Sequence, residues 1–145
     1  VRWRRGDPME YKYHFDAPCS LHDGRVRALE KDGRDLWLRF ENGYMVLTQP
    51  PRQVDGDVRV EQVEWGFSQA FVLSGSGRMG TFRGEKMELE TFVRRYGSCP
   101  FEILDECFGY NQVQYTGLLS LPDGTLREVT LCIWHNGPIV YPCRS

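Results

Sequence analysis

Alternation of apolar and polar residues runs through much of the chain and is typical of β-strands with one wet face. It is clearest at residues 10–16, where Tyr11, Tyr13 and Phe15 alternate with charged or polar neighbours. Asn42-Gly43 favours a tight hairpin turn because both residues tolerate positive φ, so we expect a three-stranded meander that ends near residue 47. The full set of predicted strands is 10–16, 26–31, 36–41, 44–47, 58–65, 69–73, 78–82, 101–107, 112–121, 126–134 and 139–141.

The hydrophobic period changes between residues 86 and 96, which predicts one helix. Its apolar positions, at spacing i, i+3, i+4 and i+7, are Leu89, Phe92, Val93 and Tyr96. Acidic residues precede this face and two arginines follow it, which complements a helix dipole, and Gly97 is expected to form a left-handed cap. The chain is therefore predicted to be mainly β (all-β or α+β), an antiparallel sandwich or partly open barrel of about ten strands with one helix near 86–96.

A chain of 145 residues has the commonest length for one domain. The alternating pattern starts only after Met9, so we divide the chain into a disordered leader or arm at 1–8 and a single β-rich domain at 9–145. The formal net charge is −2. Residues 1–8 hold three arginines and one aspartate, a net +2, which leaves −4 on residues 9–145. A mildly acidic domain is a poor match for phosphates, so we expect no nucleic-acid partner.

The cysteines indicate an intracellular compartment. There are five, an odd number at irregular spacing, in a chain large enough to fold without disulfide bonds. No apolar run approaches the roughly 18 residues that a membrane helix needs, and the N-terminus lacks the apolar stretch of a secretory signal. We expect reduced thiols, a cytoplasmic location and no membrane partner.

Two Cys-x-x-His spacings form the sharpest candidate for a metal site. They are Cys19 to His22 and Cys132 to His135, which together supply two thiols and two imidazoles, a set that tetrahedral zinc accepts. Residues three apart on a strand point to opposite faces, so the second pair needs a bulge or turn. The competing interpretation is a buried cysteine with two histidines near turns. We therefore expect no cofactor and keep zinc as the alternative.

Catalysis by a cysteine thiolate and a histidine base is a second chemical hypothesis. Its candidates are Cys99 and Cys107 as nucleophiles, His22 and His135 as bases, and Asn111 and Asn136 as orienting groups. The adjacent carboxyl groups of Asp105 and Glu106 could act as acid and base only if the fold set them across a cleft. No spacing selects among these residues, so the prediction names no catalytic residue.

The preferred candidate for a recognition site is residues 108–112. Phe108, Tyr110, Asn111 and Gln112 cluster where one predicted strand ends and the next begins. Tyrosine hydroxyls and amides in loops form binding surfaces on β scaffolds. The alternative is a wide turn whose rings cover the edge of the core.

Two parts of the chain carry a resemblance to a known group of proteins. They are Leu21–Val26 with its continuation through Leu36–Gly43, and Asp105–Gln112. Both resemble segments of small, uncharacterised bacterial β-rich proteins with a domain of unknown function. Some of these are grouped with immunity proteins, which neutralise a polymorphic toxin by binding it. The resemblance implies bacterial origin, a β-rich fold and a protein partner, and it implies no catalytic residue.

The preferred hypothesis is a non-enzymatic domain, of immunity type or another kind, that binds a protein partner, since an acidic domain would attract a basic partner surface. The first alternative is a small-ligand carrier in a barrel cavity lined by Tyr11, Trp37, Tyr115 and Trp134. The second is a metal- or cysteine-dependent enzyme. A homodimer is a further hypothesis, because open sheet edges can pair with each other.

Overall fold

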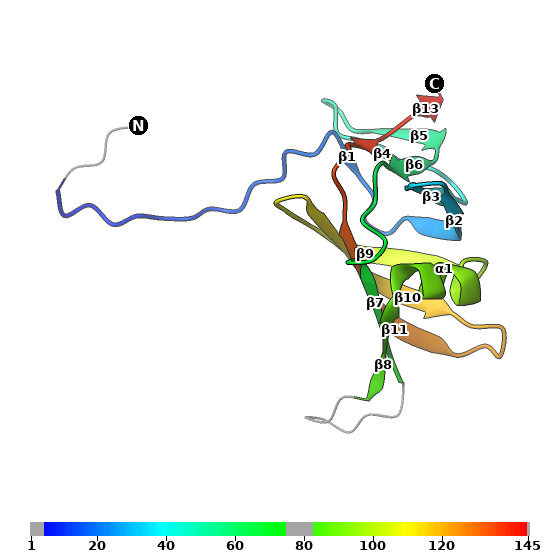
Figure 1. Cartoon of the computed structure of the whole chain (residues 1–145). Coiled ribbons are helices and arrows are strands. Elements are labelled where there is room, and N and C mark those ends of the chain that lie inside the picture. The colour runs from blue at the N-terminus through cyan, green and yellow to red at the C-terminus, as the bar shows by residue number, and fades with distance from the viewer. Residues whose placement is uncertain (1–4, 75–82, 145) are drawn as a thin grey trace.

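Two antiparallel sheets and one α-helix form the part of the chain, residues 5–74 and 83–144, that a computed structural model describes (Figure 1). The four-stranded sheet has the order β1-β4-β5-β13, and the nine-stranded sheet has the order β12-β6-β3-β2-β9-β10-β11-β7-β8. The predicted mainly β sandwich with one helix is confirmed, and the sheets do not close into a barrel. The elements are β1 (Cys19–Ser20), β2 (Arg25–Asp32), β3 (Asp35–Phe40), β4 (Tyr44–Val46), β5 (Arg52–Gly56), β6 (Val58–Val60), β7 (Gln69–Leu73), β8 (Gly84–Glu88), α1 (Leu89–Tyr96), β9 (Phe101–Gly109), β10 (Gln112–Ser120), β11 (Leu126–Trp134), β12 (Ile139–Val140) and β13 (Cys143–Arg144).

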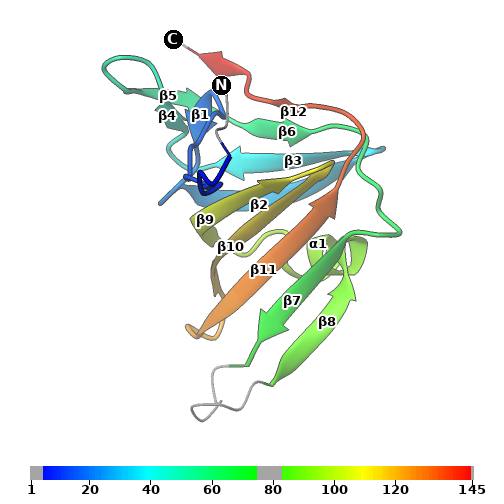
Figure 2. The same cartoon turned by 90° about the vertical axis from the view of Figure 1, so that its left-hand side faces the viewer.

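The nine-stranded sheet bends around α1. The helix contacts β2 on one side and β7, β8 and β11 on the other, although β9 and β10 lie between them in the sheet. Figure 2 shows α1 behind the strands of this sheet, on the face that carries the core. On β10 the buried residues Val113, Tyr115, Gly117 and Leu119 alternate with partly exposed ones. This period of two, read from the sequence, separates the core face from an outer face that no element covers in Figure 2.

The helix is shorter than predicted. It begins at Leu89, because residues 84–88 pair with β7 as strand β8. Gly97 ends the helix with φ −60° and ψ −25°, so the predicted left-handed cap is wrong. A Cβ at this position would lie 2.3 Å from the carbonyl oxygen of Val93 and 2.7 Å from that of Leu29. Glycine is therefore required there by close packing rather than by its backbone angles.

Asn42-Gly43 connects the two sheets. β3 pairs with β2 and β6, whereas β4 pairs with β1 and β5, so the predicted meander through residue 47 is wrong. Gly43 has φ 71°, and a Cβ on it would lie 1.8 Å from the carbonyl oxygen of Val54. Positive φ is thus found at Gly43 but not at Asn42, and β3 and β4 do not pair, so the predicted tight hairpin turn is wrong.

Residues 10–16 do not form the predicted first strand. With their neighbours they make an extended segment, the N-terminal arm (residues 9–17), which has no sheet partner among the described residues and points away from the domain (Figure 1). Tyr11 and Tyr13 are 81% and 76% exposed, while the ring of Phe15 lies 5.8 Å from that of Phe108. Apolar and polar residues thus alternate along this segment although no described strand pairs with it.

Most of the remaining strand predictions are confirmed, and the one at 69–73 matches β7 at both ends. The three long strands β9, β10 and β11 are confirmed within about two residues at each end. The strand predicted at 58–65 is shorter, Val58–Val60, and the one predicted at 78–82 lies outside the described residues. Within the described part of the chain, the only helix is far too short to span a bilayer.

Candidate functional site

The predicted recognition segment forms the tip of the β9–β10 hairpin. β9 ends at Gly109 and β10 begins at Gln112, so Tyr110 and Asn111 alone make the turn. Asn111 has φ 53°, a conformation that asparagine adopts more readily than most residues. Its carbonyl oxygen accepts the His135 N–H at 3.0 Å. The turn is therefore tight rather than wide, and it is bonded to the segment that follows β11.

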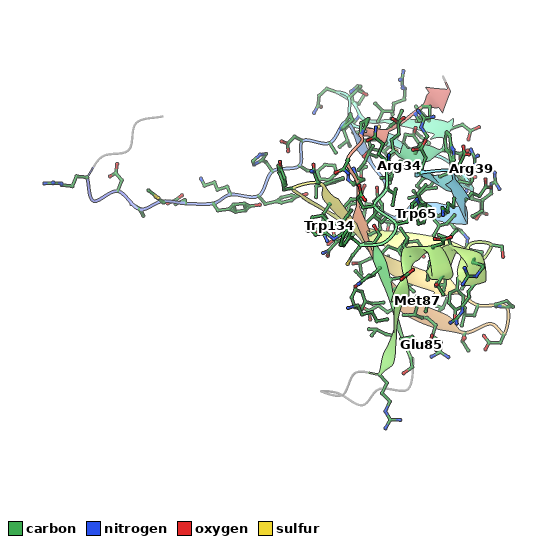
Figure 3. The ribbon with its side chains drawn as sticks, viewed as in Figure 1. Arg34, Arg39, Trp65, Glu85, Met87 and Trp134 are labelled. Atoms are coloured by element: carbon green, nitrogen blue, oxygen red, sulfur yellow. The ribbon has the colours of Figure 1, made fainter. Side chains whose placement is uncertain are left out.

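Three aromatic side chains from separate parts of the chain surround one concavity beside this turn. Phe67, Tyr110 and Trp134, which we call the aromatic patch, are 73%, 90% and 40% exposed. The concavity measures about 410 Å³, and its polar lining residues are Glu64, Asn111, His135 and Asn136. Figure 3 shows Trp134 on the side of the domain from which the N-terminal arm extends, away from Glu85.

Buried Ser68 holds the loop that carries Phe67. Its Oγ donates to the Glu64 carbonyl oxygen at 2.9 Å and accepts the Trp134 N–H at 2.9 Å. The Glu64 N–H in turn donates to the Trp134 carbonyl oxygen at 2.7 Å, and the Asn136 side chain donates to the Glu64 carboxylate. Three of these bonds join the loop to Trp134 or Asn136, so hydrogen bonds hold the loop beside the end of β11.

The predicted recognition residues do not all reach this concavity. Tyr110 and Asn111 line it. Phe108 lies on the opposite, core-side face of the hairpin, and Gln112 lies in β10 opposite the last residue of β11. The sequence did not identify Phe67, because an isolated aromatic residue in a loop gives no signal of what it will lie against.

The four residues of the predicted zinc set lie in separate places. Cys19 is buried in β1, and His22 is exposed in the following turn. Cys132 alternates with the core residues of β11 and so lies on the outer face, while His135 follows that strand. Within residues 5–74 and 83–144, no three His, Cys, Asp or Glu side chains are grouped to hold a metal ion. The structure therefore does not bring this set together.

The histidines proposed as catalytic bases contact the backbone. Nδ1 of His22 lies 2.7 Å from the Leu104 carbonyl oxygen, and Nδ1 of His135 lies 2.7 Å from that of Gly137. A carbonyl accepts hydrogen bonds only, so both Nδ1 atoms act as donors. Burial also raises the pKa of the Cys132 thiol, which disfavours a thiolate on the outer face of β11.

The aromatic residues proposed to line a carrier cavity also lie in different parts of the fold. Tyr115 is fully buried in the core, and Tyr11 is exposed on the arm. Trp37 lies under the guanidinium group of Arg39, 4.2 Å from its ring centroid, and Trp134 belongs to the aromatic patch. These four rings do not face one common space.

Of the two adjacent carboxyl groups, Glu106 reaches the core face because β9 contains a bulge. Ile103 is buried, so strict alternation would bring Asp105 to the core. Instead the register with β10 shifts by one residue at Leu104, and Glu106 lies directly opposite the buried Tyr115. A bulge of this kind redirects side chains without a break in the strand.

The Glu106 carboxyl group is largely removed from water. Oε2 accepts the Leu21 N–H at 2.9 Å, whereas Oε1 and the hydroxyl of Tyr115 are buried without a hydrogen-bond partner among the described residues. Burial raises the pKa of Glu106 to about 7, and the Asp105 charge adds to this effect. The Leu21 hydrogen bond and His22 oppose it. Glu106 is thus an inward-facing carboxyl group with one unused acceptor.

Comparison of the chain with protein-family models, with curated proteins and with solved structures found no significant match in any of the three. The resemblance to bacterial β-rich proteins therefore stays a prediction.

Proposed function

We propose that this protein is a non-enzymatic binding domain and that the aromatic patch is the surface that contacts a protein partner. The observation that carries the proposal is the grouping of Phe67, Tyr110 and Trp134, with exposures of 73%, 90% and 40%, around one concavity. Contiguous exposed apolar side chains on a folded domain mark interaction sites. Tyrosine and tryptophan are also the residues most enriched among those that dominate binding energy.

The surroundings of the patch fit a protein interface. Asn111 and Asn136 place amides beside the rings, an arrangement typical of an apolar interface centre with a polar rim. The Ser68 hydrogen bonds hold the loop before binding, which reduces the entropy lost on association. The net charge of the domain favours a partner with a basic surface. A toxin neutralised by an immunity-type protein would be one such partner.

Site-specific photo-crosslinking tests this proposal. A benzophenone amino acid replaces Tyr110 in one preparation and Leu126, 57% exposed at the far end of β11, in a matched control. We expect one discrete protein adduct from position 110 in lysate of the source organism and none from position 126. Equal crosslinking from both positions would refute the assignment of the surface.

Affinity measurements with the captured partner complete the test. Trp134→Ala and Tyr110→Ala should each weaken binding at least about tenfold, because truncation of a central aromatic residue costs more than about 1.4 kcal/mol. Leu126→Ala should change the affinity less than about twofold. Unchanged binding by both aromatic variants would show that the partner uses another surface.

A further inference from the structure

A second depression lies on the core-side face of the β9–β10 hairpin, between the hairpin and the N-terminal arm. It consists of two adjoining hollows of about 450 and 270 Å³ that share Tyr13, Phe15 and Glu106 as lining residues. We call it the Glu106 pocket. Phe108 contributes from the hairpin, and Tyr11 from the arm. None of these five residues lines the concavity of the aromatic patch.

The walls of the Glu106 pocket combine aromatic rings with carboxyl groups. The rings are those of Tyr11, Tyr13, Phe15 and Phe108, and the carboxyl groups are those of Asp16, Asp105 and Glu106. His14 and His22 also line it, and neither lysine nor arginine occurs among its described lining residues. A cation is attracted both to the negative face of an aromatic ring and to a carboxylate. This pocket therefore offers a cation two kinds of favourable contact.

Glu106 gives the pocket an unused hydrogen-bond acceptor. Its Oε1 is buried without a partner among the described residues, and the hydroxyl of Tyr115, directly opposite on β10, is in the same state. Buried polar atoms in folded proteins are nearly always paired, so an unpaired oxygen on a residue that lines both hollows points to a bound polar group. An anion would be repelled by the carboxyl groups, and an apolar ligand would leave Oε1 without a partner.

We propose that the Glu106 pocket binds an alkylammonium group. The ammonium pairs with the Glu106 carboxylate, and its alkyl stem packs on the rings of Tyr13 and Phe15. The exposed Tyr13 ring, at 76%, leaves room for this contact. Such a group occurs in free amines and in the lysine side chains of a protein partner. The site does not depend on the aromatic patch.

Proton release accompanies this binding, because an ammonium ion favours the carboxylate form of Glu106. With the pKa of the unliganded group at about 7, the apparent affinity should be about tenfold higher at pH 8 than at pH 6. The charged or titratable side chains that face Glu106 are Asp105, His22, Tyr115, Tyr141, His14 and Asp16. Burial raises the pKa of both Tyr115 and Tyr141 well above this range, so the two hydroxyls stay neutral. The pH dependence that Glu106→Gln abolishes is the part due to Glu106.

NMR titration of the full chain with n-butylammonium chloride tests the proposal, with 1-pentanol, an uncharged alcohol one carbon longer, as a neutral probe. We expect amide shifts at residues 13, 106 and 108, and at least tenfold weaker binding of pentanol. Glu106→Gln should weaken butylammonium binding at least fivefold and abolish most of its pH dependence. Glu128→Gln, at an exposed position on β11, is the matched control and should bind normally.

A second variant tests whether misfolding could explain a loss of butylammonium binding. Tyr13→Leu lies on the exposed arm and should weaken butylammonium binding about twofold to fivefold without altering the fold. Equal binding of pentanol and butylammonium, or normal binding by Glu106→Gln, would overturn the proposal. A parallel titration with Nα-acetyl-lysine methylamide identifies the source: binding admits a partner lysine, and binding of butylammonium alone restricts the site to free amines. Neither outcome affects crosslinking at position 110, so the two proposals fail independently.

Discussion

Replacing Glu106 by glutamine should stabilise the protein at alkaline pH and leave it unchanged in acid. Glutamine keeps the shape of the side chain and an acceptor for the Leu21 N–H. The folded-state pKa of Glu106 is about 7, against 4.5 for an exposed glutamate. Between these values the folded state holds more protons than the unfolded state. The stability gained from the neutral form is therefore present below pH 4.5 and is lost as pH rises through 7.

The magnitude follows from the size of the shift. A change from 4.5 to about 7 corresponds to at most about 3.4 kcal/mol at pH 8, since each pKa unit is worth about 1.36 kcal/mol. Glu106 is not fully buried, and water screens part of this cost, so we expect about 1–3 kcal/mol. Glutamine cannot ionise, so the Glu106→Gln protein should lack this loss of stability.

Urea unfolding at pH 5, 6, 7 and 8, followed by the fluorescence of the four tryptophans, measures the effect. Glu106→Gln and wild type should differ by less than about 1 kcal/mol at pH 5 and diverge steadily toward pH 8. Glu128→Gln, at an exposed position on β11, is the matched control. A constant difference between Glu106→Gln and wild type at all four pH values would refute the assignment of a raised pKa to this carboxyl group.

Substitutions at three other positions test the scaffold. Ser68→Ala leaves the Trp134 N–H without its acceptor and should lower the free energy of unfolding by about 1–3 kcal/mol in urea titrations. Ser68→Thr keeps the hydroxyl, so its free energy of unfolding should stay closer to that of the wild type. Gly117→Ala would place a Cβ 1.9 Å from the Glu102 carbonyl oxygen, so thermal unfolding should show a loss of at least about 2 kcal/mol; wild-type stability would contradict this packing. Tyr110→Ala, at a position 90% exposed, should change the free energy of unfolding by about 0.5 kcal/mol or less, and a large drop would mean that the ring is structural.

The long strands could be predicted because local pattern and final environment agree there. On β10 every second residue from Val113 to Leu119 is buried, as the alternation indicates. The bulge in β9 was not predicted: the adjacent apolar pair Ile103-Leu104 and the adjacent acids that follow break strict alternation, but the sequence does not show which residue is extra. One inserted residue exchanges the faces of Asp105 and Glu106, so the feature on which the pocket depends is invisible in the sequence.

Strand partners were harder to predict than strands. Asn42-Gly43 specifies a backbone that can turn, but the close approach of Gly43 to Val54 belongs to a crossing between sheets. The N-terminal arm is a clearer example, because Tyr11 and Tyr13 have the spacing of a strand although no described strand pairs with this segment. Pairing depends on contacts between distant residues, which one sequence does not display.

The two proposed sites lie on different sides of the tip of the β9–β10 hairpin, because successive side chains of a strand point to opposite faces. Phe108 and Glu106 project toward the core side, where the N-terminal arm lies over them, while the turn brings Tyr110 to the concavity beside Trp134. A hairpin with apolar groups on both faces normally has both faces covered. Here Tyr110 is 90% exposed and Phe108 is 41% exposed, so each face retains surface that another molecule can cover. A protein partner that engages Tyr110 could therefore reach the Glu106 pocket with a lysine side chain from around the same tip.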